Sequence, residues 1–215
     1  MIQDLDSLSE DIMIPVIFIE AYLENTPEVY RTLGKEDTTE PLAVFAEDAL
    51  KMAENARKEI KEPVSVYYSS SPDGLEAIPE GSFHGEVIEI VDAENAVPAS
   101  FITDKNTISI EELYILNPDV ILLGNEDAYK EVMNSSLWRN LDAVKNGKVY
   151  LIPSEPYSFI DNPPATNRLI GIYWLGNLLY PELYPVDIIE KTQEYYSLFY
   201  RYDLSREQAE SLLRI

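Results

Sequence analysis

The stretch that decides the fold is SIEELYILNPDVILLG, residues 109–124. Ser109 and Glu112 have the spacing of a capping box, which predicts a helix over 110–116. The Asn-Pro pair that follows ends this helix, because a residue before proline avoids the helical conformation. The aliphatic run 119–124 then predicts a buried strand. A helix followed at once by a buried strand is typical of an α/β protein with a parallel sheet.

The same alternation of strands and helices continues along most of the chain. Short β-branched or aliphatic runs predict further strands at 14–20, 64–70, 85–91 and 148–153. Periodic apolar or capped segments predict helices at 25–34, 127–134, 163–180, 186–200 and 205–214. Ser205 and Gln208 form a second capping box at the start of the last helix. We therefore expect a parallel sheet with helices on both faces.

The longest predicted helix covers residues 39–62. Its apolar residues recur at steps of three and four, which places them on one stripe: Leu42, Phe45, Ala49, Met52, Ala56 and Ile60. A helix of this length is about 35 Å long, enough to join two lobes. The chain therefore divides into residues 1–38, the helix 39–62 and an α/β unit over 63–215.

The composition excludes several classes of protein. Of the 215 residues, 46% are hydrophobic, so a substantial core can form. The net charge of -23 is the opposite of a nucleic-acid binder's basic surface, and anionic lipid would repel it. The chain has no cysteine, which excludes disulfides and thiolate metal sites. The acidic residues 1–13 lack the pattern of a signal peptide, and the interrupted apolar run 169–180 is too short to span a membrane.

Candidate ligand contacts follow the predicted strands, because open parallel sheets bind ligands beyond the carboxyl ends of their strands. The candidates are Tyr68, Ser70, Asn125, Tyr157 and Phe159. Aromatic rings can stack on a macrocycle or an aromatic chelator. A Tyr68 phenolate could also bind ferric iron, as tyrosinate does in some haem sites, although ordinary packing is the commoner reason for a tyrosine there.

The segment PYSFIDNPPATNR, residues 156–168, joins the last strand to an apolar helix. Asn162 and Pro163 have the residue types of a helix start. Asp161 then lies just before a helix N-terminus, where the dipole favours a negative charge, and we expect it to be exposed. Arg168 lies two turns further on, where it is expected to brace the loop through a carboxylate or carbonyl rather than touch ligand.

Neither a metal site nor a catalytic site is indicated. His84 is the only histidine. It has no second His or Cys as a partner and precedes the predicted strand 85–91, at the end away from the expected ligand site, so we assign it a structural or surface role. Acidic pairs such as 111–112 lack the spacing of a calcium loop. The sequence has no phosphate loop, dinucleotide-binding glycine motif or nucleophile elbow.

Several segments, in order, resemble the substrate-binding proteins of iron-complex ABC transporters. They are residues 67–97, SIEELYILNPDVILLG (109–124), LWRNLDAVKNGKVYLIP (137–153), NRLIGIYWLGNLLYPELYP (167–185) and YYSLFYRYDLSREQAESLL (195–213). The resemblance implies a class III periplasmic-binding-protein fold, in which a long helix joins two α/β lobes and ligand lies between them. Residues 1–38 would be a remnant of the N-terminal lobe, and 63–215 the Rossmann-like C-terminal lobe.

The resemblance also implies a function. Such a protein is the extracytoplasmic component, periplasmic or a cell-surface lipoprotein, of an importer for a ferric siderophore, haem, a corrinoid such as cobalamin or a related metal chelate. It has no catalytic residues and no resident cofactor. An ABC permease would dock on an acidic patch, with Asp161 facing a permease arginine and Arg168 beside it. Most of the first lobe does not match, so binding could be impaired, and the exposed half-cleft could form a homodimer.

Two other classes share parts of the pattern. A chelatase-like or nitrogenase-like subunit has a similar two-lobed architecture, but it would be expected to use several histidines and acids in its cleft. A non-transport interaction module would dimerise through the exposed half-cleft, and its mass in solution would distinguish it from a monomeric binding protein.

Overall fold

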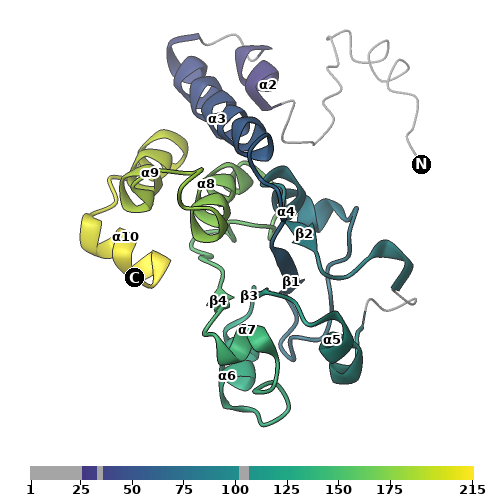
Figure 1. Ribbon diagram of the computed structural model, residues 1–215. Coiled ribbons are helices and arrows are strands. Elements are labelled where there is room, and N and C mark those ends of the chain that lie inside the picture. The colour runs from purple at the N-terminus through teal and green to yellow at the C-terminus, as the bar shows by residue number, and fades with distance from the viewer. Residues whose placement is uncertain (1–25, 33–35, 102–106) are drawn as a thin grey trace, which may run out of the picture.

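The computed structural model describes residues 26–32, 36–101 and 107–215 (Figure 1). Within these residues, four strands form one parallel sheet in the order β2-β1-β3-β4. The strands are β1 (Ser65–Ser69), β2 (Glu94–Asn95), β3 (Val120–Leu123) and β4 (Val149–Leu151). The sheet confirms the predicted α/β class, whereas the predicted strand 14–20 lies outside the described residues.

Helices surround this sheet in nearly the predicted order. They are α2 (Thr26–Thr32), α3 (Glu36–Arg57), α4 (Glu86–Ile90), α5 (Ile110–Leu116), α6 (Glu126–Asn134), α7 (Asp142–Lys145), α8 (Asn167–Leu179), α9 (Ile188–Tyr195) and α10 (Arg206–Leu213). Shorter turns are η2 (Phe83–Gly85), η3 (Ala99–Phe101) and the π-helical turn η4 (Tyr196–Tyr200), which continues α9. Both predicted capping boxes are present, at the starts of α5 and α10.

The long helix α3 has 22 residues, and it begins and ends slightly before the predicted bounds of 39 and 62. Its buried face is rich in alanine, which lets it lie close to α8 (Figure 1). Phe45 adds an aromatic contact, since its ring lies 5.4 Å from that of Tyr173 in α8 and 5.5 Å from that of Phe199 in η4. The helix is therefore held by the last third of the chain.

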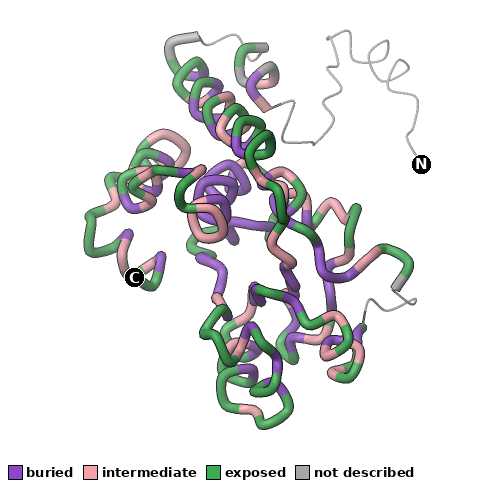
Figure 2. The backbone as a smooth tube through the Cα atoms, in the orientation of Figure 1, coloured by how far each residue is buried: buried purple, intermediate pink, exposed green. Residues whose placement is uncertain are grey.

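The core lies on both faces of the sheet. Val66 and Tyr68 of β1 pack on the side of α3 and α8, whereas Tyr67 packs on the side of α6. This alternation is the normal consequence of strand geometry. Helix α8 is buried along most of its length, as Figure 2 shows, because it packs against α3, α4 and α9. No helix in the described parts of the chain is both long and apolar enough to cross a membrane.

The predicted strand 85–91 is wrong: this segment forms the helix α4, and the second strand is the short edge strand β2. Val87, Ile88 and Val91 are all fully buried, and their spacing also fits one face of a helix. Asp92 then adopts a positive φ of 59°, which ends the helix before β2 begins. A short apolar run did not distinguish a strand from a helix here.

The predicted helix start at 163 is also wrong, because α8 begins at Asn167. Pro163 lies in the preceding loop, after a cis peptide bond. This loop packs directly on the helix: a Cβ atom at Gly171 would overlap the carbonyl oxygen of Phe159. The close approach brings Ile160 and Asp161 into the interior of the protein.

Candidate ligand-binding site

The register of the sheet brings the carboxyl ends of β1 and β3 together. Ser69 pairs with Leu123, and the Gly124 N–H donates to the Ser69 carbonyl at 2.9 Å. A Cβ atom at Gly124 would lie 3.3 Å from the Ser70 Cβ and 3.6 Å from the Tyr68 hydroxyl oxygen. Tyr68 and Ser70 therefore lie beside the chain that leads into Asn125, as the sequence predicted.

Tyr68 is fully buried within this group. Burial raises the pKa of its phenol, and the negative charge of Asp161 raises this pKa further. The phenol is therefore neutral at physiological pH, which disfavours the predicted phenolate ligand for ferric iron. The adjacent Tyr67 is also buried, and its hydroxyl donates to the Gly74 carbonyl at 2.8 Å on the other face.

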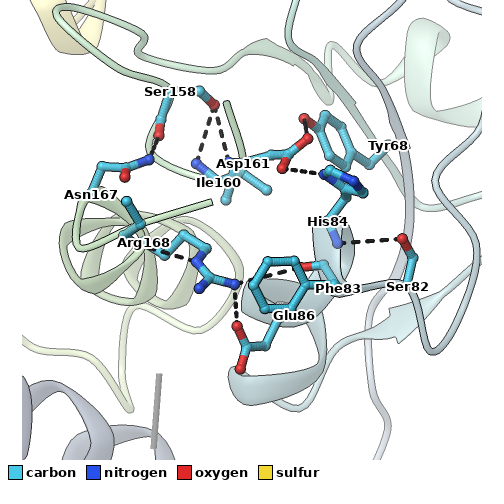
Figure 3. Close-up of polar contacts among 11 residues, drawn as sticks. Tyr68, Ser82, Phe83, His84, Glu86, Ser158, Ile160, Asp161, Asn167 and Arg168 are labelled. Carbon is cyan, nitrogen blue, oxygen red and sulfur yellow. Dashed lines mark hydrogen bonds and ion pairs between the residues drawn. The ribbon is translucent and has the colours of Figure 1, made fainter. Parts of the chain in front are cut away.

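Asp161 is 2% exposed, so the prediction of an exposed acid is wrong. One of its carboxylate oxygens lies 2.6 Å from Nδ1 of His84, and the other receives a long 3.5 Å hydrogen bond from the Tyr68 hydroxyl (Figure 3). The Ser158 hydroxyl accepts from the N–H groups of Ile160 and Asp161, both at 3.3 Å. This turn directs the carboxylate inward, away from a docking surface.

His84 belongs to the same group, although the sequence placed it away from the ligand site. It lies in η2, where the Ser82 hydroxyl accepts from its N–H at 3.3 Å. Its side chain is half exposed while that of its partner Asp161 is buried. No local signal in the sequence indicates this pair, because 77 residues separate its members. The prediction that His84 lies away from the ligand site came from the wrong assignment of a strand at 85–91.

Arg168 braces the loop, as its residue type and spacing predicted. Its guanidinium forms an ion pair with Glu86, donates to the carbonyl oxygens of Ala165 at 3.3 Å and Phe83 at 3.5 Å, and lies 4.5 Å from the centre of the Phe83 ring (Figure 3). Burial lowers its pKa, which the charge of Glu86 opposes. Because Arg168 is 2% exposed, its predicted place beside a docking surface is wrong.

The other predicted contacts differ in their accessibility. Phe159 is 1% exposed and packs in the core, so it does not face ligand in this structure. The Asn125 side chain caps α6, since its Oδ1 accepts from the Asp127 N–H at 2.8 Å and the Ala128 N–H at 3.3 Å. Tyr157 is 48% exposed and remains available for stacking.

A hollow of about 710 Å³ lies near the carboxyl end of β4. It is bounded by the loop 152–156, by Tyr196 and Tyr202, and by residues of α10. Arg214, at the end of α10, forms an ion pair with Glu126 at 2.8 Å, which ties α10 to the start of α6. The described residues contain no group of three or more His, Cys, Asp or Glu side chains that could hold a bare metal ion.

Comparison with known proteins places these observations in a family. The family model described as Periplasmic binding protein matches residues 15–156. Over 62% of this chain, the sequence is 33% identical to the Molybdate-binding protein MolA of Haemophilus influenzae, and the match covers 38% of that protein. Over 57% of this chain, it is 26% identical to the High-affinity heme uptake system protein IsdE of Staphylococcus aureus, and the match covers 44% of that protein. The match therefore spans less than half the length of these curated relatives.

Solved structures of solute-binding proteins resemble this protein over nearly the whole chain. An ABC transporter solute binding protein from Sulfurospirillum deleyianum has a TM-score of 0.87 and 30% identity, with 98% of this chain and 68% of that chain covered. A periplasmic solute binding protein from Veillonella parvula has a TM-score of 0.76 and 23% identity, with 98% and 67% covered, and shows the fold alone. All these names describe binding or uptake, which agrees with the prediction of a ligand-binding protein that is not an enzyme.

Proposed function

Because the chain belongs to the periplasmic binding protein family, we propose that it acts as the extracytoplasmic solute-binding component of an ABC importer. Its cargo in this proposal is a small molecule that contains a metal, such as an iron chelate, haem or a corrinoid. Residues 63–215 would form one wall of the ligand site. Helix α3 would join this wall to a second lobe, of which the residues before α3 would be a remnant.

The observation that carries this proposal is the shared carboxyl edge of β1 and β3. There Tyr68 and Ser70 lie beside Gly124 and the chain leading into Asn125, and His84 is half exposed beside the buried Asp161. Parallel sheets bind their ligands at this edge. The likeness to a solved ABC transporter solute binding protein, over 98% of the chain, supports a solute-binding role for this chain.

The names of the relatives support a metal-containing cargo. One relative is called a molybdate-binding protein and another a heme uptake protein. Molybdate and haem differ in size and charge, but each contains a metal atom. We therefore favour a metal compound over a sugar, a peptide or an amino acid.

The second partner in this proposal is the permease of the importer. The net charge of -23 supports a cationic docking face on that permease, because complementary charge steers the encounter and fixes its orientation. Since Asp161 and Arg168 are buried, we assign docking to exposed acids elsewhere on the surface.

Ligand binding tests the proposal directly. The whole chain is titrated with haemin, with molybdate and with a ferric hydroxamate, while tryptophan fluorescence and heat of binding are recorded. We expect saturable binding of at least one of these probes by a monomer. If none binds, and the chain is instead a stable dimer by light scattering, the non-transport interaction module replaces the proposed function.

A further inference from the structure

We propose that Nε2 of His84 is a direct ligand to the metal atom of the cargo, and that Asp161 orients the imidazole for this role. This inference rests on the proposed function, because it requires a cargo that contains a metal. It goes further by naming the donor atom and the chemical class of cargo: a metal chelate with an open coordination position.

The first argument is the direction of the hydrogen bond between the two side chains. The Asp161 carboxylate is buried and lies 2.6 Å from Nδ1 of His84. A carboxylate oxygen accepts, so Nδ1 carries the proton and donates it. In the neutral ring, Nε2 then keeps its lone pair. This nitrogen belongs to a side chain that is half exposed, so an external ligand can reach it.

The second argument is the match with histidines that bind metals. Such a histidine usually donates its other N–H to a carboxylate or carbonyl, which fixes the tautomer and raises the basicity of the ligating nitrogen. Asp161 provides this carboxylate, and the Tyr68 hydroxyl at 3.5 Å holds its second oxygen. The carboxylate is thus held on both sides before any cargo arrives.

The third argument concerns the rigidity of the segment that carries His84. The neighbouring Glu86 forms an ion pair with the buried Arg168, and the Phe83 carbonyl accepts from the same guanidinium at 3.5 Å. The Ser82 hydroxyl accepts from the His84 N–H at 3.3 Å. A ligand held within a rigid frame loses little freedom on binding, which favours coordination.

The composition of the site narrows the class of cargo. His84 is the only histidine in the chain, there is no cysteine, and the described residues contain no group of three possible ligands. One imidazole cannot hold a bare ion, because metal sites in proteins need several ligands. The remaining ligands must come from the cargo itself. A chelate with one or two open positions fits this requirement, whereas an oxyanion such as molybdate would need a protonated Nε2 as hydrogen-bond donor.

The single histidine makes the test unambiguous. The whole chain, without a histidine tag, is titrated with Cu(II)–iminodiacetate and with haemin, both of which have open coordination positions, and with molybdate for comparison. Pulsed electron paramagnetic resonance of the copper complex detects the remote nitrogen of a bound imidazole, which can only come from His84. We expect this signal in the unmodified chain, and at least tenfold weaker copper binding without the signal in His84→Ala.

The variant Asp161→Asn distinguishes a histidine that Asp161 orients for coordination from a histidine that binds copper only because it is exposed. It should weaken copper binding about 10- to 100-fold, as loss of a carboxylate behind a metal-bound histidine does elsewhere. Because this variant replaces a buried charge and can fail to fold, the tautomer is also measured without mutation. In chain labelled with nitrogen-15 at its histidine, at pH 8, we expect a protonated Nδ1 and an unprotonated Nε2.

Each outcome decides the inference. Chelate binding that is equally tight in His84→Ala, or a proton on Nε2, overturns it and leaves the proposed function standing. Binding of molybdate alone, weakened by His84→Ala, overturns it in favour of an oxyanion donor site. If neither Cu(II)–iminodiacetate nor haemin binds the unmodified chain, the inference falls; if molybdate and the ferric hydroxamate also fail to bind, the proposed function falls with it.

Discussion

Replacing Arg168 with methionine should destabilise the protein strongly, although Arg168 touches no proposed ligand atom. The Arg168 and Glu86 side chains are 2% and 14% exposed, so neither charge is well solvated. Removing one member of a buried ion pair costs about 3–5 kcal/mol, because the other charge remains buried. Water still reaches part of Glu86, which favours the lower limit, about 3 kcal/mol. With a urea m-value of about 2 kcal/mol/M, the unfolding midpoint falls by about 1.5 M.

A double-mutant cycle tests the reason for this loss. Replacing Glu86 with methionine as well removes both charges and leaves two unbranched apolar side chains. We expect the double variant to recover at least 2 kcal/mol of the summed losses, since apolar replacement of a whole buried pair is often nearly neutral (about 0 kcal/mol). Arg206→Met is the matched control, because Arg206 pairs with Glu210 at 3.1 Å but is 57% exposed. Its cost should be under about 1 kcal/mol.

Urea unfolding followed by circular dichroism gives all of these free energies. The reasoning fails if Arg168→Met loses less than about 1 kcal/mol, the range of exposed pairs. It also fails if the losses at Arg168 and Glu86 simply add, because additivity shows that the two charges do not depend on each other.

Three further predictions concern the packing, the tyrosines and the ligand. Gly171→Ala should destabilise the protein by about 3 kcal/mol in urea unfolding, because the new methyl group overpacks the contact with Phe159. Gly147→Ala should cost only about 1 kcal/mol, because there only the positive φ of 68° opposes a side chain. Burial raises the pKa of the Tyr68 phenol above its unfolded value of about 10, so the stability it contributes below pH 10 is lost as pH rises further. The Tyr68 part of the alkaline absorbance change, obtained as the difference from Tyr68→Phe, should therefore appear together with unfolding, not before it. Tyr157→Ala should weaken haemin binding about fivefold, because a stacking ring is lost. Tyr202→Ala is the control, since Tyr202 is also 48% exposed, and it should leave haemin binding unchanged. The reverse result would place the ligand in the hollow beside α10.

The parts of the fold that were predicted correctly have local causes. The capping boxes at Ser109 and Ser205 both form, because their partners lie three residues away. The strands β1, β3 and β4 were found because each is a short apolar run between clear turn signals. The run 85–91 has the same composition, yet it becomes α4. Only the tertiary structure, which packs Val87 and Ile88 against one core, decides between the two conformations.

The site was predicted only as far as topology allows. A parallel sheet gathers the ends of its strands, so Tyr68 and Ser70 could be placed near Asn125 from their positions alone. Whether a side chain faces the solvent depends on how its loop folds. Phe159 and Asp161 were expected outside and lie inside, because Gly171 lets their loop pack on the backbone of α8. The sequence of the loop alone therefore does not indicate that these two side chains are buried.

The Arg168–Glu86 ion pair and the hydrogen bond between His84 and Asp161 make one mechanical unit, and this links stability to binding. Arg168 and Asp161 both come from the segment around the start of α8, and both reach the segment 82–86: Arg168 holds Glu86, and Asp161 holds His84. Two contacts on either side of Gly85 fix both the position and the direction of this short segment. Loss of the Arg168 contact should therefore move the imidazole even though Asp161 is unchanged. A stability defect and a weakened copper complex should then appear together in Arg168→Met, while Arg206→Met should show neither.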